Sequence, residues 1–207
     1  LFHIPTRESE YWDVTTDFVA RDVQPDQVDD IMFNQATYLE KNKRYGEERE
    51  ILDHILREFP DTELFPLVMM GRLQSFLLEK EYSQCLSESC ELTQNFTSGT
   101  FEHFVGGYYQ AMVFYKTRDN WSDLAKTREA LDLATLDIYK RLGGLYGSEL
   151  DLAVNSIGWQ LKIARMQEDD EERERLLGIL QGFPHHRKKN MLLDIYQHIS
   201  NHDPQGQ

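Results

Sequence analysis

The feature that most constrains the fold of this chain is a repeat between Met32 and Phe96. Three pairs of apolar residues recur at a spacing of 37 positions: Tyr45 and Tyr82, Ile55 and Leu92, and Phe59 and Phe96. A spacing of about 20–50 residues is typical of solenoid proteins, in which one helix pair cannot bury its own apolar face and stacks on a copy. The repeat therefore predicts an all-α fold, an α-solenoid of stacked antiparallel helix hairpins.

The apolar residues of the first repeat follow helical spacing. Pro25 suits a first helical position, and the apolar stripe that follows it ends at a polar turn, residues 42–46. A second stripe then occupies positions i, i+1, i+4, i+5 and i+8 of a helix: Ile51, Leu52, Ile55, Leu56 and Phe59. Pro60 ends that helix because proline cannot continue its hydrogen bonds. One helix pair is therefore predicted between Pro25 and Pro60.

Three further helix pairs are predicted after Pro60. The second begins at Thr62, a plausible N-cap, the third begins near Ser98, and the fourth opens at Ser148. Gly106 and Gly107 lie inside the first helix of the third pair, where each glycine costs roughly 1 kcal/mol of helix propensity. We therefore expect a neighbouring backbone to approach them closely.

The predicted organisation is one repeat domain with short flanking segments. Residues 1–25 are predicted to be an N-terminal arm or short helix, residues 26–200 the helical repeat domain, and residues 201–207 a disordered tail. The last predicted helix, from Met191 to Ile199, is amphipathic and is expected to cap the stack.

The charge of the chain narrows the classes of partner. A formal net charge of −14 disfavours nucleic acid, because there is no excess of lysine and arginine to displace phosphate counterions. It favours solubility and at most a basic partner. No uncharged apolar run reaches about 18 residues, so no transmembrane segment is expected.

The cysteines bear on the cellular compartment. Cys85 and Cys90 are five positions apart, which places them on different faces of a helix and disfavours a disulfide between them. Buried, reduced thiols are expected, and they favour a cytoplasmic location. The chain begins at Leu1 rather than Met, so the cell envelope or periplasm is the alternative if an N-terminal signal has been removed.

The helix pairs resemble tetratricopeptide repeats, which combine a small residue in the first helix, an aromatic residue at the turn and an aromatic–proline stop. The residues that carry the resemblance are Ala36, Tyr45 and Phe59-Pro60, then Leu73, Tyr82 and Phe96, then Met112 and Trp121. It covers roughly Asp26 to Pro184, and it is degenerate. Glu48 stands where the second helix usually has a small residue, and no tryptophan opens the first helices.

What the resemblance implies is an interaction scaffold whose first helices line a concave groove. By register, the candidates to face that groove are Phe33, Thr37, Met70, Gln74, Tyr109 and Val113. Family members that bind chaperone tails carry a lysine and an asparagine on the first groove helix. Phe33 and Thr37 occupy those places here, so a chaperone tail is not the expected partner.

A compact basic patch follows the last aromatic–proline stop, and it comprises His185, His186, Arg187, Lys188 and Lys189. Its arginine and lysines are candidates to contact an acidic partner or a lipid headgroup. The alternative is that they neutralise the acidic run 168–172 across a neighbouring helix.

No group of residues has the spacing of a catalytic or metal site. Glu50 and His54 share a helix face with Glu58, but no second pair completes a ligand set. We therefore expect no enzymatic activity and no cofactor. The predicted function is a scaffold or adaptor that buries a protein or peptide segment against Met70, Tyr109 and their neighbours. A structural subunit of a larger complex and a helical enzyme are the alternatives.

Overall fold

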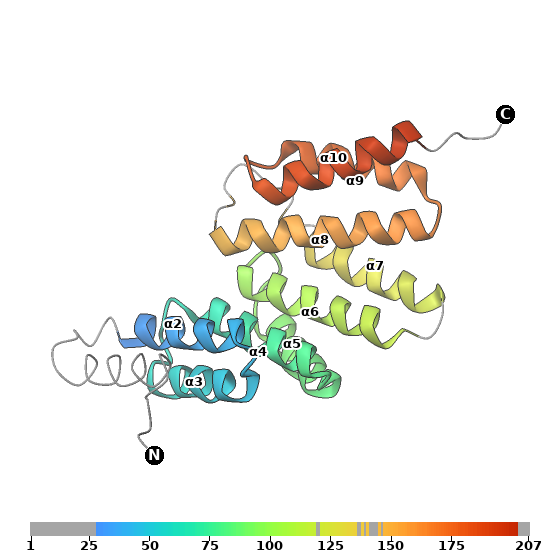
Figure 1. The fold of residues 1–207 in the computed structure, drawn as a ribbon. Coiled ribbons are helices and arrows are strands. Elements are labelled where there is room, and N and C mark those ends of the chain that lie inside the picture. The colour runs from blue at the N-terminus through green and yellow to red at the C-terminus, as the bar shows by residue number, and fades with distance from the viewer. Residues whose placement is uncertain are drawn as a thin grey trace, which may run out of the picture. The chain divides into compact units, whose positions relative to one another are not determined.

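The computed structural model describes residues 28–118, 121–135, 138, 140, 145 and 147–202. These residues form helices and connecting turns without a strand, so the all-α prediction is confirmed (Figure 1). Nine helices are described, in the order α2 (Val28–Lys41), α3 (Tyr45–Glu58), α4 (Phe65–Glu79), α5 (Tyr82–Asn95), α6 (Phe101–Thr117), α7 (Trp121–Thr135), α8 (Gly147–Met166), α9 (Asp170–Gly182) and α10 (Arg187–His202). The predicted N-terminal arm lies outside the described residues.

The chain divides into two compact units, residues 1–79 and 80–207. Unit 1 contains α2 to α4 and unit 2 contains α5 to α10. The sequence predicted one domain over residues 26–200, whereas the division falls in the turn between α4 and α5. It therefore separates the two helices predicted to form the second pair.

Unit 1 is built around α3, which packs against both α2 and α4. Its core includes a fully buried cluster of Ala36, Leu52, Ile55 and Val68, and Leu39 and Leu73 are also fully buried. Glu48 also lies inside this unit with only 2% of its surface exposed. Its Oε2 atom has no hydrogen-bond partner among the described residues. An ionisable side chain thus lies in the interior of unit 1.

Three of the turns between helices contain a residue with a left-handed backbone conformation. Lys43 and Lys80 have φ angles of 60° and 67°, in the left-handed region, and they are 37 positions apart like the repeat itself. At the first of these turns the Arg44 N–H donates to the Leu39 carbonyl at 2.9 Å, which satisfies an end carbonyl of α2. Glu168, between α8 and α9, has a φ of 57°. The same kind of turn therefore joins successive helices at three places.

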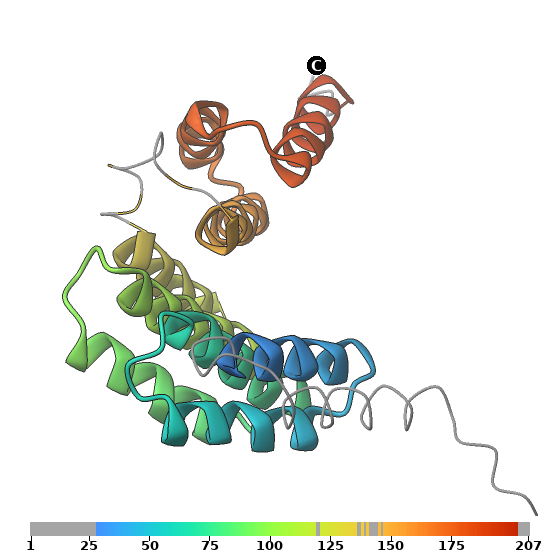
Figure 2. The same ribbon diagram turned by 90° about the vertical axis from the view of Figure 1, so that its left-hand side faces the viewer.

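Each helix of unit 2 contacts the next one along the chain, and α8 also contacts α6 and α10 (Figure 2). The most buried helix is α6, because both α5 and α7 pack on it. A Cβ atom added at Gly106 would lie 2.7 Å from the Ser89 carbonyl oxygen, and one added at Gly107 would lie 2.6 Å from the Ala134 Cβ. The expected close approach is confirmed, with one glycine facing each neighbouring helix.

Threonine side chains lie just before two of the helices. The Thr62 hydroxyl accepts a hydrogen bond from the Leu64 backbone at 3.1 Å, just before α4. The Thr100 hydroxyl caps α6 by accepting from the His103 backbone at 3.3 Å, so this helix starts slightly after Ser98. Thr100 therefore supplies an acceptor for a free N–H group at the start of α6. Leu64 precedes the first residue of α4, so Thr62 forms a turn before that helix and is not the predicted N-cap.

Two predicted boundaries in the C-terminal part are wrong. α8 begins at Gly147, so Ser148 lies within the helix rather than at its cap. α10 runs from Arg187 to His202, which is longer at both ends than the predicted 191–199, and it includes the start of the predicted tail. Residues 203–207 lie outside the described part of the chain.

Candidate functional site

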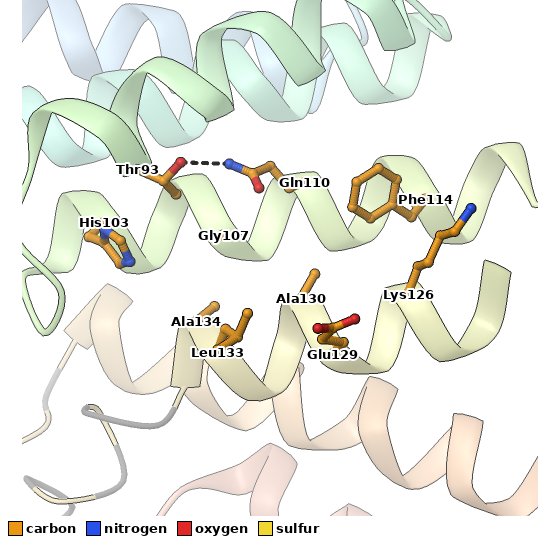
Figure 3. A pocket seen from close by; sticks show the side chains of 10 residues that line it. All are labelled: Thr93, His103, Gly107, Gln110, Phe114, Lys126, Glu129, Ala130, Leu133 and Ala134. Atoms are coloured by element: carbon orange, nitrogen blue, oxygen red, sulfur yellow. Dashed lines mark hydrogen bonds between the residues drawn. The ribbon is translucent and has the colours of Figure 1, made fainter. Parts of the chain in front are cut away.

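A hollow of unit 2 lies along α6 and α7 and has a volume of about 410 Å³ (Figure 3). One residue of α5 completes its wall. Most of the surface that lines it is apolar, because the polar residues contribute little of that surface. The lining residues are Thr93, His103, Gly107, Gln110, Phe114, Lys126, Glu129, Ala130, Leu133 and Ala134. We call this hollow the α6–α7 pocket. Its volume suits a side chain or short segment of a partner, because ligand pockets typically occupy about 300–1,000 Å³.

Helical spacing on α6 and α7 produces the pocket. The α6 residues recur at i, i+4, i+7 and i+11, and those of α7 at i, i+3, i+4, i+7 and i+8, so each set shares one helix face. Gly107 and Ala134 form the floor of the pocket, because these small residues allow α6 and α7 to pack closely. At the rim, Leu133 is 63% exposed, an unusual setting for a large apolar side chain.

Polar contacts hold one wall of the α6–α7 pocket in place. The Gln110 side-chain amide donates to the Ser89 carbonyl at 3.0 Å and to the Thr93 hydroxyl at 2.8 Å, as Figure 3 shows for the second contact. His103 Nδ1 lies 3.1 Å from the Phe96 carbonyl. These hydrogen bonds fasten α6 to α5, so the pocket has a preorganised wall on that side.

The groove residues predicted on α6 lie elsewhere. Tyr109 and Val113 are only 4% and 3% exposed, which places both in the core of unit 2. Their next neighbours, Gln110 and Phe114, line the pocket instead. Successive residues of a helix point about 100° apart, so an error of one residue in the predicted register selects a buried face instead of an open one. Their burial gives no support to a partner contact at Tyr109 or Val113.

The groove residues predicted in unit 1 are partly buried. Phe33 packs against the core of this unit, and the Thr37 hydroxyl donates to the Phe33 carbonyl at 3.0 Å. Met70 is also partly buried, and the Gln74 amide donates to the Glu40 carboxylate at 2.6 Å. Contact of these four residues with a partner stays a prediction.

Most of the basic patch makes contacts within unit 2. The Lys189 ammonium donates to the Gln181 carbonyl at 2.8 Å and also to the Phe183 carbonyl, so it caps the C-terminal end of α9. His186 Nε2 lies 2.7 Å from the Asp151 carboxylate of α8. Arg187 is exposed. Lys189 thus makes a structural contact within unit 2, and contact of Arg187, Lys188 and Lys189 with a partner stays a prediction.

The acidic run 168–172 is contacted by arginines rather than by the basic patch. Arg128 of α7 lies 2.8 Å from Asp169 and 3.5 Å from Glu172, and Arg175 lies 2.6 Å from Glu172. The hydrogen bond from Arg128 is the main reason why the pKa of Asp169 is lowered. The alternative interpretation of the basic patch, as the counter-charge of this run, therefore does not match these contacts.

Neither cysteine has the environment of an activated thiol. Burial raises the pKa of the Cys85 thiol to about 12 and also raises the pKa of Cys90, whereas a nucleophilic thiolate requires a lowered pKa. Both cysteines are free thiols in the structure.

The carboxylate–histidine row of α3 is engaged by an arginine on the same helix. Arg57 lies 2.8 Å from the His54 ring and 3.0 Å from the Glu58 carboxylate. No group of three or more metal-ligating side chains with suitable placement occurs among the residues that the structure describes.

Comparison with known proteins returned no match to any family model, curated protein or solved structure. The resemblance to tetratricopeptide repeats therefore stays a prediction from the sequence. Among the described helices, none combines the length and apolar character needed to cross a membrane.

Proposed function

We propose that this chain is a non-enzymatic scaffold or adaptor that binds a segment of a partner protein. We further propose that its helix pairs stack as a tetratricopeptide-like α-solenoid with α10 as the capping helix. The repeated left-handed turns at Lys43, Lys80 and Glu168 support this arrangement, because equivalent turns are what copied helix hairpins would have. The contacts between successive helices of unit 2 also favour it.

The observation that carries the proposed function is the α6–α7 pocket with an exposed leucine at its rim. Leu133 leaves most of its surface in water beside a preformed apolar hollow that includes Phe114 and Ala130. A partner that inserts an apolar side chain there would cover this surface and gain the hydrophobic free energy of its burial. Binding of this kind needs no catalytic group.

The test is affinity capture with quantitative mass spectrometry, comparing the wild-type chain with Leu133→Glu. We expect this variant to lose the main partner, since a carboxylate at the rim would be desolvated on binding. Leu78→Glu is the matched control, because Leu78 is an exposed leucine of α4 in the other unit (48% exposed). It should retain the partner.

A photo-crosslinking amino acid at position 133 adds a direct measurement. It should crosslink to the same protein that Leu133→Glu fails to capture. Equal capture by the wild-type chain and both variants would contradict the proposed pocket. A chain that aggregates alone and is soluble only with a fixed companion would favour the structural-subunit alternative.

A further inference from the structure

A second hollow of unit 2 lies between α8 and α10 and has a volume of about 250 Å³. It is lined by Val154, Asn155, Gly158, Trp159, Lys162, Lys188 and Leu192. The α8 residues fall at helical spacing on one face, as do Lys188 and Leu192 of α10. We call it the α8–α10 pocket. It shares no residue with the α6–α7 pocket.

The apolar part of the α8–α10 pocket is rigidly held. The Trp159 ring packs on Tyr115 of α6 with ring centroids 4.6 Å apart. Gly158 leaves room for Leu192, whose methyl carbon would be 3.4 Å from a Cβ added at the glycine. A fixed aromatic ring beside a leucine is the kind of surface that anchors a partner side chain.

The apolar surface continues along α10 beyond the pocket. Met191 and Ile195 are 49% and 44% exposed, and they lie three and seven positions after Lys188. Lys188, Met191, Leu192 and Ile195 therefore share one helical stripe. This stripe starts at a positive charge and runs on as exposed apolar surface.

Two ammonium groups stand at the pocket without a counter-charge. Lys162 Nζ lies 4.7 Å from the Trp159 ring centroid and 5.2 Å from that of Tyr115. Lys188 donates to the Asn155 side-chain oxygen. Among the described residues neither lysine forms an ion pair with a carboxylate, and no lining residue of the pocket is acidic. This is unusual in a chain with a formal net charge of −14.

We propose that the α8–α10 pocket binds an acidic segment of a partner protein, with carboxylates at Lys162 and Lys188 and an apolar side chain on Trp159 and Leu192. The charge of the pocket selects the occupant, because a carboxylate supplies the counter-charge that both lysines lack. The stripe on α10 adds apolar contact area next to that charge. The inference rests on the proposed role in protein binding but uses a separate surface.

The test is selection of a random displayed peptide library against the full-length chain. We expect the enriched peptides to combine aspartate or glutamate with large apolar residues. They should bind Lys162→Glu/Lys188→Glu about tenfold more weakly or worse, since each reversed charge repels a carboxylate. Their binding should also weaken as the salt concentration rises. Circular dichroism establishes that the variant is folded.

The matched control is Lys41→Glu/Lys116→Glu, which changes the net charge by the same amount at exposed lysines of α2 and α6. It should bind the selected peptides like the wild-type chain. The indole N–H signal of Trp159, assigned with Trp159→Phe, should shift when a selected peptide is added. This signal reports directly on the pocket.

Four outcomes would overturn the inference. These are no enriched peptide, enriched peptides without acidic residues, unchanged binding to the charge-reversed variant, and lysine-dependent binding only to anionic vesicles or to a second copy of the chain. Leu133→Glu distinguishes failure of this inference from failure of the proposed function. The variant changes only the α6–α7 pocket, so it should still bind the selected peptides. If capture of the main partner depends on Leu133 alone, the scaffold function stands and the α8–α10 pocket does not.

Discussion

At the residue scale, Glu48 is the most unusual side chain of unit 1. Burial raises its pKa to about 8 from an ordinary value of 4.5. The carboxylates of Glu40 on α2 and Glu79 on α4 raise it further, while Arg49, its neighbour on α3, lowers it. A buried carboxyl in such surroundings holds a proton that the unfolded chain would release. The position that the sequence identified as an exception to the repeat is thus a neutral acid at neutral pH.

We predict that unit 1 loses stability as the pH rises from 4.5 toward about 8. Across this window the folded chain keeps the proton of Glu48 and the unfolded chain does not, so the free energy of unfolding falls with pH. Glu48→Gln should remove most of this dependence, because the amide cannot ionise. The pH dependence of the free energy of unfolding of unit 1 is measured by urea titration, with the methyl NMR signals of Leu52 and Ile55 as the probes.

The control for this prediction is Glu47→Gln, one residue away on the same helix. Glu47 is exposed, and its hydrogen bond with Arg44 lowers its pKa, so it does not release a proton on unfolding in that window. The variant should keep the pH dependence of the wild-type chain. Equal pH dependence in the wild-type chain and Glu48→Gln would show that Glu48 does not hold the proton.

At the element scale, the position of α6 depends on two glycines that face opposite neighbours. Gly106 admits the backbone of α5 and Gly107 admits Ala134 of α7. Contacts of 2.6–2.7 Å to an added Cβ cannot be relieved by rotating a side chain, because the atoms it meets are a backbone oxygen and another Cβ. The helices themselves would have to move apart. The same contact between α6 and α7 forms the floor of the α6–α7 pocket.

We predict that Gly106→Ala and Gly107→Ala each destabilise unit 2. Overpacking typically costs about 1–3 kcal/mol, which exceeds the roughly 1 kcal/mol that alanine gains over glycine in a helix. Gly178→Ala is the control, since nothing lies within 4 Å of a Cβ added there in α9. This variant should be as stable as the wild-type chain or more so. Chemical denaturation measures the differences, and stability gains at all three positions would contradict the close packing.

At the scale of the whole molecule, the division between Glu79 and Lys80 is the main feature that the repeat did not predict. Unit 2 holds a large buried core of its own, which includes Phe104, Leu131, Ile157, Leu161 and Leu176. A domain with its own hydrophobic core can in principle fold alone. The repeat spacing of 37 residues relates residues on both sides of this division, although the two units are compact separately.

We predict that residues 80–207 fold when expressed alone. The fragment should show a helical circular dichroism spectrum and a cooperative thermal transition, because the core of unit 2 is internal to it. A fragment without a cooperative transition would show that unit 2 depends on unit 1 for its stability.

The order of the helices and most of their ends follow from local properties of the sequence. Apolar spacing, the stop at Pro60 and the two turns 37 residues apart depend on neighbours in the chain, so they can be predicted without a structure. Gly106 and Gly107 also predicted that another helix approaches α6 closely, because only a packing contact could compensate for their poor helix propensity. Nothing local showed which helix each glycine would meet.

Only the tertiary structure decided which face of each helix is open. Tyr109 is buried and Phe114 lines a pocket because α5, α7 and α8 together set the rotation of α6 about its axis. Trp159 of α8 and Lys188 of α10 line one pocket for the same reason. A turn of about 100° per residue makes such assignments depend on the sum of many long-range contacts. The spacing of apolar residues determines that a helix has a buried side, and the packing of its neighbours determines how much of the rest remains open.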